Sequence, residues 1–372
     1  MLTKFEVTNF KNFEKTLIFD FKNIKNYKFN EECIVDGTAY KSLIYGHNGM
    51  GKSNLGFAML DIVSHLTDKN FDKDKFTHYI NASSTADVAT FKYEFEFKGS
   101  SVVYIYTKES VDVLISEELI INDTLYASID KRQSTIAKIF ARGTETLNKD
   151  MGNSKVSILS YINKNSILDE EENNNIIFNE FLDFVNKMLF FRSLEENRYI
   201  GLEQGTKAID EDIISHDNVE DFEYFLNEMG IECKLDILKI DFLNIKQLVF
   251  DFGNSQIPFF EIASSGTKAL ALFYFWIQRL KYNKVKFVFI DEFDAFYHHT
   301  LSFKIIEQLK KIDIQVIVTT HNTSLISNEL LRPDCYFLLK NNEIKSLANR
   351  TVKELREAHN IEKMYKADSF GL

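Results

Sequence analysis

Alternating hydrophobic and polar positions predict β-strands in two stretches near the beginning of the chain. From Leu2 to Phe21 the alternation is interrupted by the turn Lys11-Asn12, which predicts two strands joined by that turn. From Ala89 to Tyr126 the alternation returns, with turn residues between its segments. We therefore expect a strand-rich region in the first third of the protein.

Helical spacing replaces this alternation elsewhere. The short apolar run Ser42–Tyr45 predicts a strand, and the apolar residues between Ser53 and Leu66 recur at the spacing of a helix. Further helices are predicted over Ile176–Phe191 and Val219–Met229. The rest of the stretch from about residue 127 to about residue 245 has no clear pattern.

Strand and helix patterns alternate in the last part of the chain. The predicted elements are a hairpin around Gly253-Asn254, a helix over Gly266–Lys281, a strand over Lys286–Ile290, a helix over Leu301–Lys310 and a strand over Gln315–Thr320. Such alternation is typical of proteins with a parallel sheet, so the predicted fold class is α/β.

Composition and charge exclude several classes of protein. With 372 residues, the chain is long enough for one large domain with an insertion or for two domains. The net charge of -11 argues against a generally basic nucleic-acid-binding surface, although a local basic groove is compatible with it. The widely spaced Cys33, Cys233 and Cys335 fit neither a disulfide framework nor a zinc site, which indicates a reducing cytosol. Neither a signal-like leader nor a membrane-spanning apolar run is found, so no membrane association is expected.

A glycine-rich loop after the strand Ser42–Tyr45 matches the phosphate-binding pattern GxxxxGK[ST]. Its residues are Gly46, His47, Asn48, Gly49, Met50, Gly51, Lys52 and Ser53. Glycines let backbone N–H groups turn toward one anion, and the following helix adds the positive end of its dipole. Lys52 would reach the β- and γ-phosphates, and Ser53 would supply an oxygen to Mg²⁺. The alternative is a chance glycine turn, but the strand and helix around the loop favour a nucleotide site.

Two carboxylates follow the apolar run Phe287–Ile290. A buried strand of a parallel sheet would deliver Asp291 and Glu292 to the edge where ligands bind. Asp291 would hold Mg²⁺ through water, and Glu292 would polarise the attacking water. Alone, the pattern fits a buried strand ending in an acidic turn equally well. Together with the phosphate loop, it supplies both halves of a phosphoryl-transfer site.

Two further segments extend this candidate site. His321 follows the predicted strand Gln315–Thr320 and could bond a γ-phosphate oxygen, although an ordinary turn histidine is the alternative. A second anion site is indicated where N–H groups and hydroxyls begin the predicted helix, at Ser264, Ser265, Gly266, Thr267 and Lys268. The alternative there is a simple helix cap, for which Ser265 is well suited.

Taken together, these motifs resemble those of ABC-type ATPases of the SMC/RecF branch, and more narrowly those of compact AAA-type ATPases found in bacterial anti-phage defence and restriction-linked loci. The resemblance covers roughly residues 1–65 and 248–372. Its segments are Phe5–Phe13 as the first strand, Ile44–Leu55 with the phosphate loop, Ala263–Leu270 as the signature, Phe289–His299 and Val318–Leu325 as the Asp-Glu and His motifs, and Leu331–Asp334 and Thr351–Tyr365 in the tail.

The resemblance implies a P-loop ATPase head with a mixed sheet and an α+β insertion. The head would comprise residues 1–90 and 248–372, and residues 91–247 would form an insertion that senses a partner. ATP and Mg²⁺ would bind at the interface of a head-to-tail dimer or higher oligomer, with Asn54 added to the nucleotide contacts. Glu292 and His321 would be catalytic, while Ser53 and Asp291 would bind the metal. Such a cytoplasmic switch would regulate a separately encoded effector, for instance a nuclease, in anti-phage defence.

The chain departs from the family pattern at several positions. Thr267 and Lys268 occupy places that usually hold glycine and glutamine, and His298 stands where many ABC proteins carry the D-loop aspartate. No glutamine is identified as the Q-loop residue, and Gln133 is not counted as a site residue.

Other functions remain open at this point. A RecF-like DNA-repair or chromosome-associated ATPase would clamp DNA directly, which the acidic net charge mildly disfavours. A nucleotide-gated scaffold without hydrolysis is disfavoured by Glu292. A GTPase is disfavoured because no Asn-Lys-x-Asp motif is found, and a small-molecule kinase would not need residues 264–268 or His321.

Overall fold

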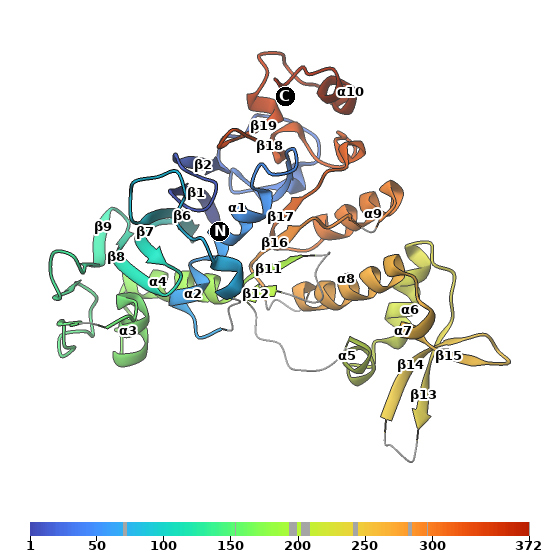
Figure 1. Cartoon of the computed structure of the whole chain (residues 1–372), viewed down its shortest axis with the longest axis horizontal. Helices are drawn as coiled ribbons and strands as arrows, with labels where there is room; N and C mark the ends of the chain where they lie inside the picture. Colours follow the sequence, from blue (N-terminus) through green and yellow to red (C-terminus); the bar gives the residue numbers. More distant parts are fainter. Residues whose placement is uncertain are drawn as a thin grey trace.

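The computed structural model describes residues 1–69, 73–152, 154–192, 199–201, 209–240, 245–281, 285–295 and 297–371. Figure 1 shows a large antiparallel sheet on one side, a mostly parallel sheet in the centre and a small third sheet at the opposite end. No helix in these ranges is both long and apolar enough to cross a membrane.

The antiparallel sheet is built from the predicted strand-rich region. From edge to edge its strands are β10 (Lys138–Ile139), β9 (Thr124–Asp130), β8 (Val113–Ile121), β7 (Ser100–Ser110), β6 (Ala89–Phe97), β1 (Leu2–Thr8) and β2 (Leu17–Asp20). Buried and half-buried residues alternate along β6, as expected where one face of a sheet covers a core. Because β6 pairs with β1, the strands after residue 89 extend the sheet that the first strands begin.

The central sheet carries the phosphate loop and both acidic residues. Its strand order is β12 (Tyr199–Gly201), β11 (Met188–Arg192), β16 (Phe287–Asp291), β17 (Gln315–Thr319), β5 (Lys41–Tyr45), β18 (Tyr336–Lys340) and β19 (Glu343–Ser346). The five inner strands are parallel, and the two edge strands are antiparallel to their neighbours. Strands β16 and β5 therefore end at the same edge of the sheet, separated by β17.

One predicted helix is partly wrong. The range Ile176–Phe191 was expected to be helical throughout, but α4 (Asn173–Asn186) ends first and β11 follows as a strand of the central sheet. Residues 188–191 are buried on both faces of the sheet, so they form a continuous apolar run without alternation. Such a run is compatible with either a helix or a buried parallel strand.

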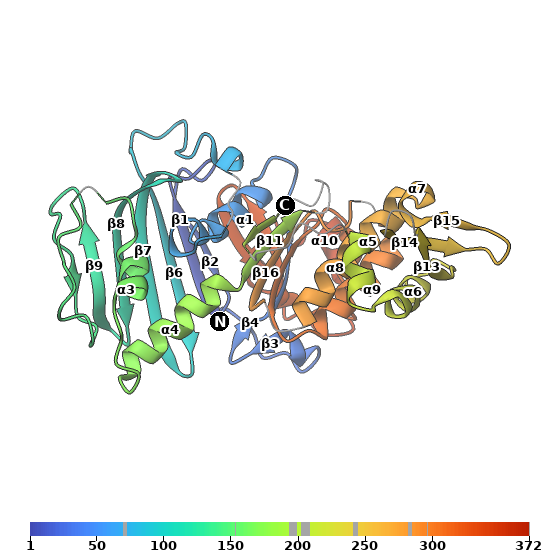
Figure 2. The ribbon, with the colours of Figure 1, turned by 90° about the horizontal axis from the view of Figure 1, so that it is seen from below.

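Helix α1 (Lys52–Leu60) lies between the two large sheets. On one side a Cβ at Gly56 would lie 2.6 Å from the ring of Phe190, so only glycine permits this close approach to the central sheet. On the other side the hydroxyl of Tyr93, from β6, donates to the carbonyl of Ala58 at 2.9 Å. Figure 2 shows α8 (Ser265–Lys281) and α9 (His299–Lys310) beyond the opposite face of the central sheet.

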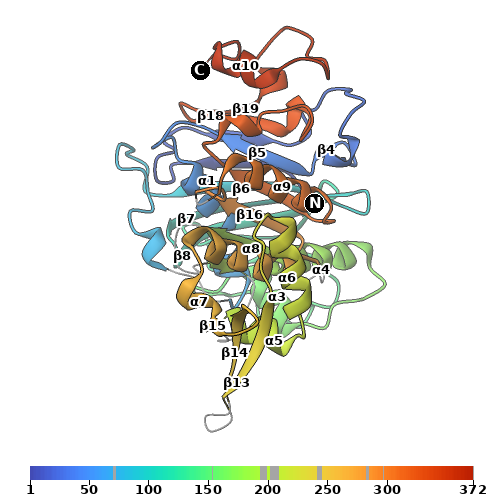
Figure 3. The same cartoon turned by 90° about the vertical axis from the view of Figure 1, so that its right-hand side faces the viewer.

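A third lobe surrounds the second half of α8. It consists of β13 (Leu235–Ile240), β14 (Ile245–Asp251), β15 (Gln256–Pro258), α5 (Ile209–Ser215), α6 (Val219–Glu228) and α7 (Phe259–Ile262). Figure 3 shows this lobe at one end of the molecule and the C-terminal α10 (Ile361–Lys366) at the other. Besides short 3-10 helices, the described residues also form the hairpin β3 (Ile34–Val35) and β4 (Thr38–Ala39), with α2 (Val63–Leu66) and α3 (Ile158–Asn165) against the antiparallel sheet.

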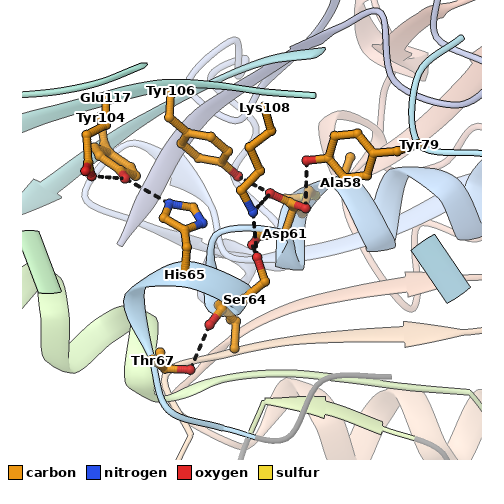
Figure 4. A network of polar contacts seen from close by, with 12 residues as sticks. Ala58, Asp61, Ser64, His65, Thr67, Tyr79, Tyr104, Tyr106, Lys108 and Glu117 are labelled. Carbon is orange, nitrogen blue, oxygen red and sulfur yellow. Dashed lines mark hydrogen bonds and ion pairs between the residues drawn. The ribbon is translucent and has the colours of Figure 1, made fainter. Parts of the chain in front are cut away.

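A buried polar network ties the end of α1 to the antiparallel sheet (Figure 4). Lys108 of β7 and Asp61 are both fully buried, and their Nζ and Oδ2 atoms lie 2.8 Å apart. Tyr79 and Tyr106 donate their hydroxyls to the same carboxylate at 2.9 and 3.0 Å, and Lys108 also donates to Ser64 at 2.6 Å. A buried charge pair needs such additional hydrogen bonds to offset its loss of hydration.

Candidate functional site

The phosphate loop connects β5 to α1 and depends on glycine at two positions. Gly49 and Gly51 adopt φ angles of 80° and 94°, a region in which other residues are strained. A Cβ at Gly51 would also lie 2.3 Å from the side chain of Asn12. Gly51 caps α1, so the first N–H groups of the helix open toward the loop. This geometry suits an anion.

Lys52 points back into the loop that precedes it. Its ammonium donates to the carbonyl of Gly46 at 2.8 Å and to that of His47 at 3.3 Å. The residue is buried, and this burial lowers the pKa of Lys52, while the nearby carboxylates of Asp291 and Glu292 oppose that shift. The lysine charge therefore lies between the phosphate loop and the acidic pair.

Asp291 ends β16 as a fully buried carboxylate. Its Oδ1 accepts a hydrogen bond from Thr319 Oγ1 at 2.6 Å, whereas Oδ2 accepts none among the described residues. Burial raises the pKa of Asp291, and the hydroxyls of Ser53 and Thr319 counteract this effect. A buried carboxylate oxygen without a hydrogen bond, next to the serine of a phosphate loop, is a suitable donor for a divalent cation.

Glu292, directly after β16, has an unusual backbone conformation. Its φ angle is 49°, a left-handed conformation that costs free energy for any residue but glycine and is often found at functional sites. The N–H of Glu292 donates to Thr319 Oγ1 at 2.8 Å. One threonine hydroxyl therefore fixes both acidic residues.

Arg192 also contacts both acidic residues, from the end of β11. Its Nη2 and Nε donate to Glu292 Oε2 at 2.7 and 3.3 Å, and its Nε lies 3.4 Å from Asp291 Oδ2. The two strands are in register, with Arg192 opposite Asp291.

His321 follows β17 at the same edge of the sheet. Burial lowers the pKa of His321, and the charge of Lys52 lowers it further, while Glu292 and Asp291 raise it. These influences place the imidazole within electrostatic reach of the lysine and the acidic pair, and they favour its neutral form at neutral pH.

The signature segment begins α8, and the side chain that caps this helix is that of Ser264. The alternative reading made Ser265 the capping residue, whereas the hydroxyl of Ser264 accepts the N–H of Thr267 at 3.1 Å. Ser265 is exposed and is the first residue of the helix, as is typical of a side chain that does not cap. No hydrogen bond or ion pair between described residues joins residues 264–268 to the phosphate loop of the same chain.

Thr319, Arg192 and Asn12 were missed by the sequence analysis. Asn12 accepts a hydrogen bond from Asn54 at 2.7 Å and donates to the carbonyl of Met50 at 3.3 Å, so it closes one side of the loop. It lies within the first-strand motif Phe5–Phe13, but no local signal in the sequence marks it as a site residue. Phe296, within the expected Asp-Glu motif, lies outside the described residues.

A family profile covers the segments that build this site. The profile described as "AAA domain, putative AbiEii toxin, Type IV TA system" matches residues 42–327, which is well over half of the chain. The chain belongs to this family. This AAA domain binds nucleotide as a P-loop ATPase domain, and the match includes the phosphate loop, the signature segment, the acidic pair and His321. The predicted α/β fold and the predicted kinship with P-loop ATPases are thereby confirmed.

Solved structures of SMC head domains are similar to the chain. The SMC head from Thermotoga maritima aligns with a TM-score of 0.46 and 15% identity, over 92% of this chain and 97% of that chain. The SMC head from Pyrococcus furiosus, with an extended coiled coil and bound to the C-terminal domain of ScpA, aligns with a TM-score of 0.47 and 14% identity, over 99% and 98%. No curated protein sequence matches the chain.

Proposed function

We propose that this AAA domain binds ATP with magnesium and hydrolyses it. The observation that carries the proposal is the meeting of the phosphate loop with two acidic residues at one edge of the central sheet. Lys52 would neutralise the phosphates, and the N–H groups of residues 46–53 would cradle them. Both halves of a phosphoryl-transfer site are then supplied by one subunit.

The residues at this edge fit a magnesium ion. Oδ2 of Asp291, which accepts no hydrogen bond from the described residues, and the hydroxyl of Ser53 are oxygen donors of the kind that Mg²⁺ prefers, and Asp291 would act through bound water. The ion would supply charge stabilisation to the phosphates. Glu292 would accept a proton from the attacking water, and the neutral His321 would bond the transferred phosphate group.

We further propose that hydrolysis works as a switch in a head-to-tail dimer. Ser265 and Lys268 are exposed at the start of α8, and Lys268 would add a positive charge there. In a dimer these groups and the free N–H groups of the helix would face the partner's nucleotide. Tyr297, which follows the acidic pair, donates to the carbonyl of Ala269 at 2.9 Å and so links that segment to the subunit's own site.

The proposed biological role is regulation of a separate effector in anti-phage defence. The description of the family names a toxin of a type IV toxin–antitoxin system, which supports a place in defence. Residues 91–247 would sense the partner, and an effector such as a nuclease would be encoded separately.

The nucleotide site is tested by Lys52→Ala. The variant removes the permanently positive side chain of the phosphate loop, so ATP affinity measured by calorimetry is expected to fall by about a hundredfold, or about 2.7 kcal/mol. Lys15→Ala, an exposed lysine outside the loop, is the matched control and should bind ATP normally. Unchanged affinity in Lys52→Ala would refute the assignment.

Hydrolysis is tested by Glu292→Gln. The amide keeps the shape of the side chain but cannot accept the proton, so turnover is expected to fall by about a hundredfold or more while ATP still binds. The variant should also accumulate as a dimer in the presence of ATP, measured by light scattering. Turnover at the wild-type rate would show that another residue acts as the base.

A further inference from the structure

Arg192 contacts both acidic residues, and the function proposed above gives it no role. Its side chain is about one quarter exposed (24%), and the Glu292 side chain is similarly protected (22%). A charge-assisted contact of 2.7 Å in such surroundings is short and strong. Both members of this pair are therefore partly shielded from water.

The geometry of the contact fixes Glu292 in place. Nη2 and Nε of Arg192 both donate to the same oxygen of Glu292, Oε2, so the guanidinium holds this side of the carboxylate by two hydrogen bonds. The backbone of Glu292 is already fixed by its bond to Thr319 and by its left-handed φ of 49°. Movement of the Glu292 carboxylate away from this position would consequently break both of these bonds to Arg192.

The same guanidinium also approaches the carboxylate that would serve a metal. Arg192 Nε lies 3.4 Å from Asp291 Oδ2, the oxygen without a hydrogen bond. Strand register holds the two residues opposite each other, so the approach is set by the pairing of β11 with β16. Two cations close to one buried carboxylate repel each other strongly, because the surrounding protein screens charge poorly.

We propose that Arg192 is a positioning residue that clamps Glu292 and competes with magnesium for Asp291. The clamp holds the proposed base in place, and the guanidinium must withdraw from Asp291 before that carboxylate can serve the metal. This inference rests on the proposed ATPase function, and it makes the magnesium requirement of the site depend on a side chain that does not bind the metal.

The test measures the magnesium requirement rather than turnover. In Arg192→Ala the half-saturating Mg²⁺ concentration for ATP binding, measured by calorimetry, is expected to fall at least about threefold, because no guanidinium has to withdraw. Arg192→Lys keeps the positive charge but lacks the forked donors of the guanidinium. Its half-saturating Mg²⁺ concentration should lie between those of the wild-type protein and Arg192→Ala. An unchanged Mg²⁺ requirement in Arg192→Ala would overturn the proposal. A higher Mg²⁺ requirement would also overturn it, by showing that Arg192 helps to hold the nucleotide.

A matched control separates this effect from lost stability. Arg279→Ala removes another half-buried guanidinium with two bonds to one carboxylate, at 3.1 and 2.9 Å from Asp212, but in the third lobe. It should lower the melting temperature and leave the magnesium requirement unchanged. If Arg192→Ala does not fold, Arg192→Gln replaces it, because the amide is neutral and can still donate a hydrogen bond.

A melting experiment without nucleotide distinguishes failure of the clamp from failure of the ATPase proposal. Mg²⁺ alone should raise the melting temperature of Arg192→Ala more than that of the wild-type protein. If the wild-type protein binds no ATP but this difference is found, the ATPase proposal fails and the clamp stands. If the wild-type protein binds ATP with magnesium and Mg²⁺ stabilises both proteins equally, only the clamp fails.

Discussion

At the scale of single residues, the sequence is most informative where chemistry lies in consecutive positions. The phosphate loop and the pair Asp291-Glu292 could be identified because each motif is local. Thr319 and Arg192 could not, since they reach the acidic residues only through the pairing of β17 and β11 with β16. The proximity of these two side chains to the acidic residues depends on the order of the strands in the sheet. A single sequence does not specify that order.

Thr319 offers a test of this positioning. In Thr319→Val the buried Asp291 loses its donor and the Glu292 N–H loses its acceptor. Each group left unpaired is expected to cost about 1–3 kcal/mol of stability. Because both acidic residues lose their support, kcat is expected to fall about tenfold or more, with a smaller change in ATP affinity.

The matched variant Thr319→Ser keeps the hydroxyl and should retain most of the activity. Steady-state kinetics and urea unfolding provide the two measurements. If Thr319→Val keeps the wild-type kcat, the hydroxyl does not position the acidic residues for catalysis.

At the scale of elements, most predicted strands and helices are found, and the failure has a physical cause. Alternation predicted β6 because one face of this strand is only half-buried, whereas β11 is buried on both faces and shows no alternation. Ile176–Phe191 was assigned to one helix because the helical period of α4 runs directly into this apolar strand. Only pairing with β16, about a hundred residues later, makes Met188–Arg192 a strand.

The contact of α2 with the antiparallel sheet predicts a pH dependence of stability. His65 Nε2 hydrogen-bonds the hydroxyl of Tyr104 at 2.9 Å, and burial, together with the charge of Lys108, holds the pKa of His65 well below its ordinary value of 6.5. Above pH 6.5 neither the folded nor the unfolded chain carries a proton there. Below it only the unfolded chain does, so the free energy of unfolding decreases as the pH falls.

His65→Gln isolates this contribution from that of the carboxylates. Between about pH 7.5 and about pH 5.5, the wild-type protein is expected to lose about 1.4 kcal/mol more unfolding free energy than the variant. Urea unfolding at the two pH values measures the difference. Equal losses would mean that the imidazole takes up a proton in the folded protein.

At the scale of the whole molecule, the predicted division into a head and an insertion stays a prediction. Strands from residues 1–90 and from residues 91–247 share the antiparallel sheet, and β11 lies inside the central sheet. The layers of the fold are therefore not contiguous in sequence. The signature segment has no bond to its own phosphate loop among the described residues, so the dimer proposed above would leave it available to the partner's nucleotide.

A dimer with shared sites predicts that one substitution can abolish ATP hydrolysis without abolishing ATP binding. Ser265→Arg would place a bulky cation where the partner's γ-phosphate belongs, so it should abolish hydrolysis while its own phosphate loop still binds ATP. Ser264→Ala is the control for the helix cap, since Ser264 makes the capping bond, and it should cost only about 1 kcal/mol of stability. If Ser265→Arg hydrolyses ATP at the wild-type rate, the segment serves only to begin α8.

Mixing two inactive variants then decides whether the sites are shared between subunits. In a dimer of Ser265→Arg with Lys52→Ala, the intact phosphate loop of the first subunit faces the intact signature of the second. One complete site is rebuilt, while the other carries both defects, so partial ATPase activity should return. Differently tagged subunits, purified through both tags, establish that mixed dimers have formed. Because each variant alone lacks a complete site, activity in the doubly purified dimer can arise only at the interface between them. Mixed dimers without activity would show either that the two sites hydrolyse ATP only together or that the signature segment does not contact the partner's ATP.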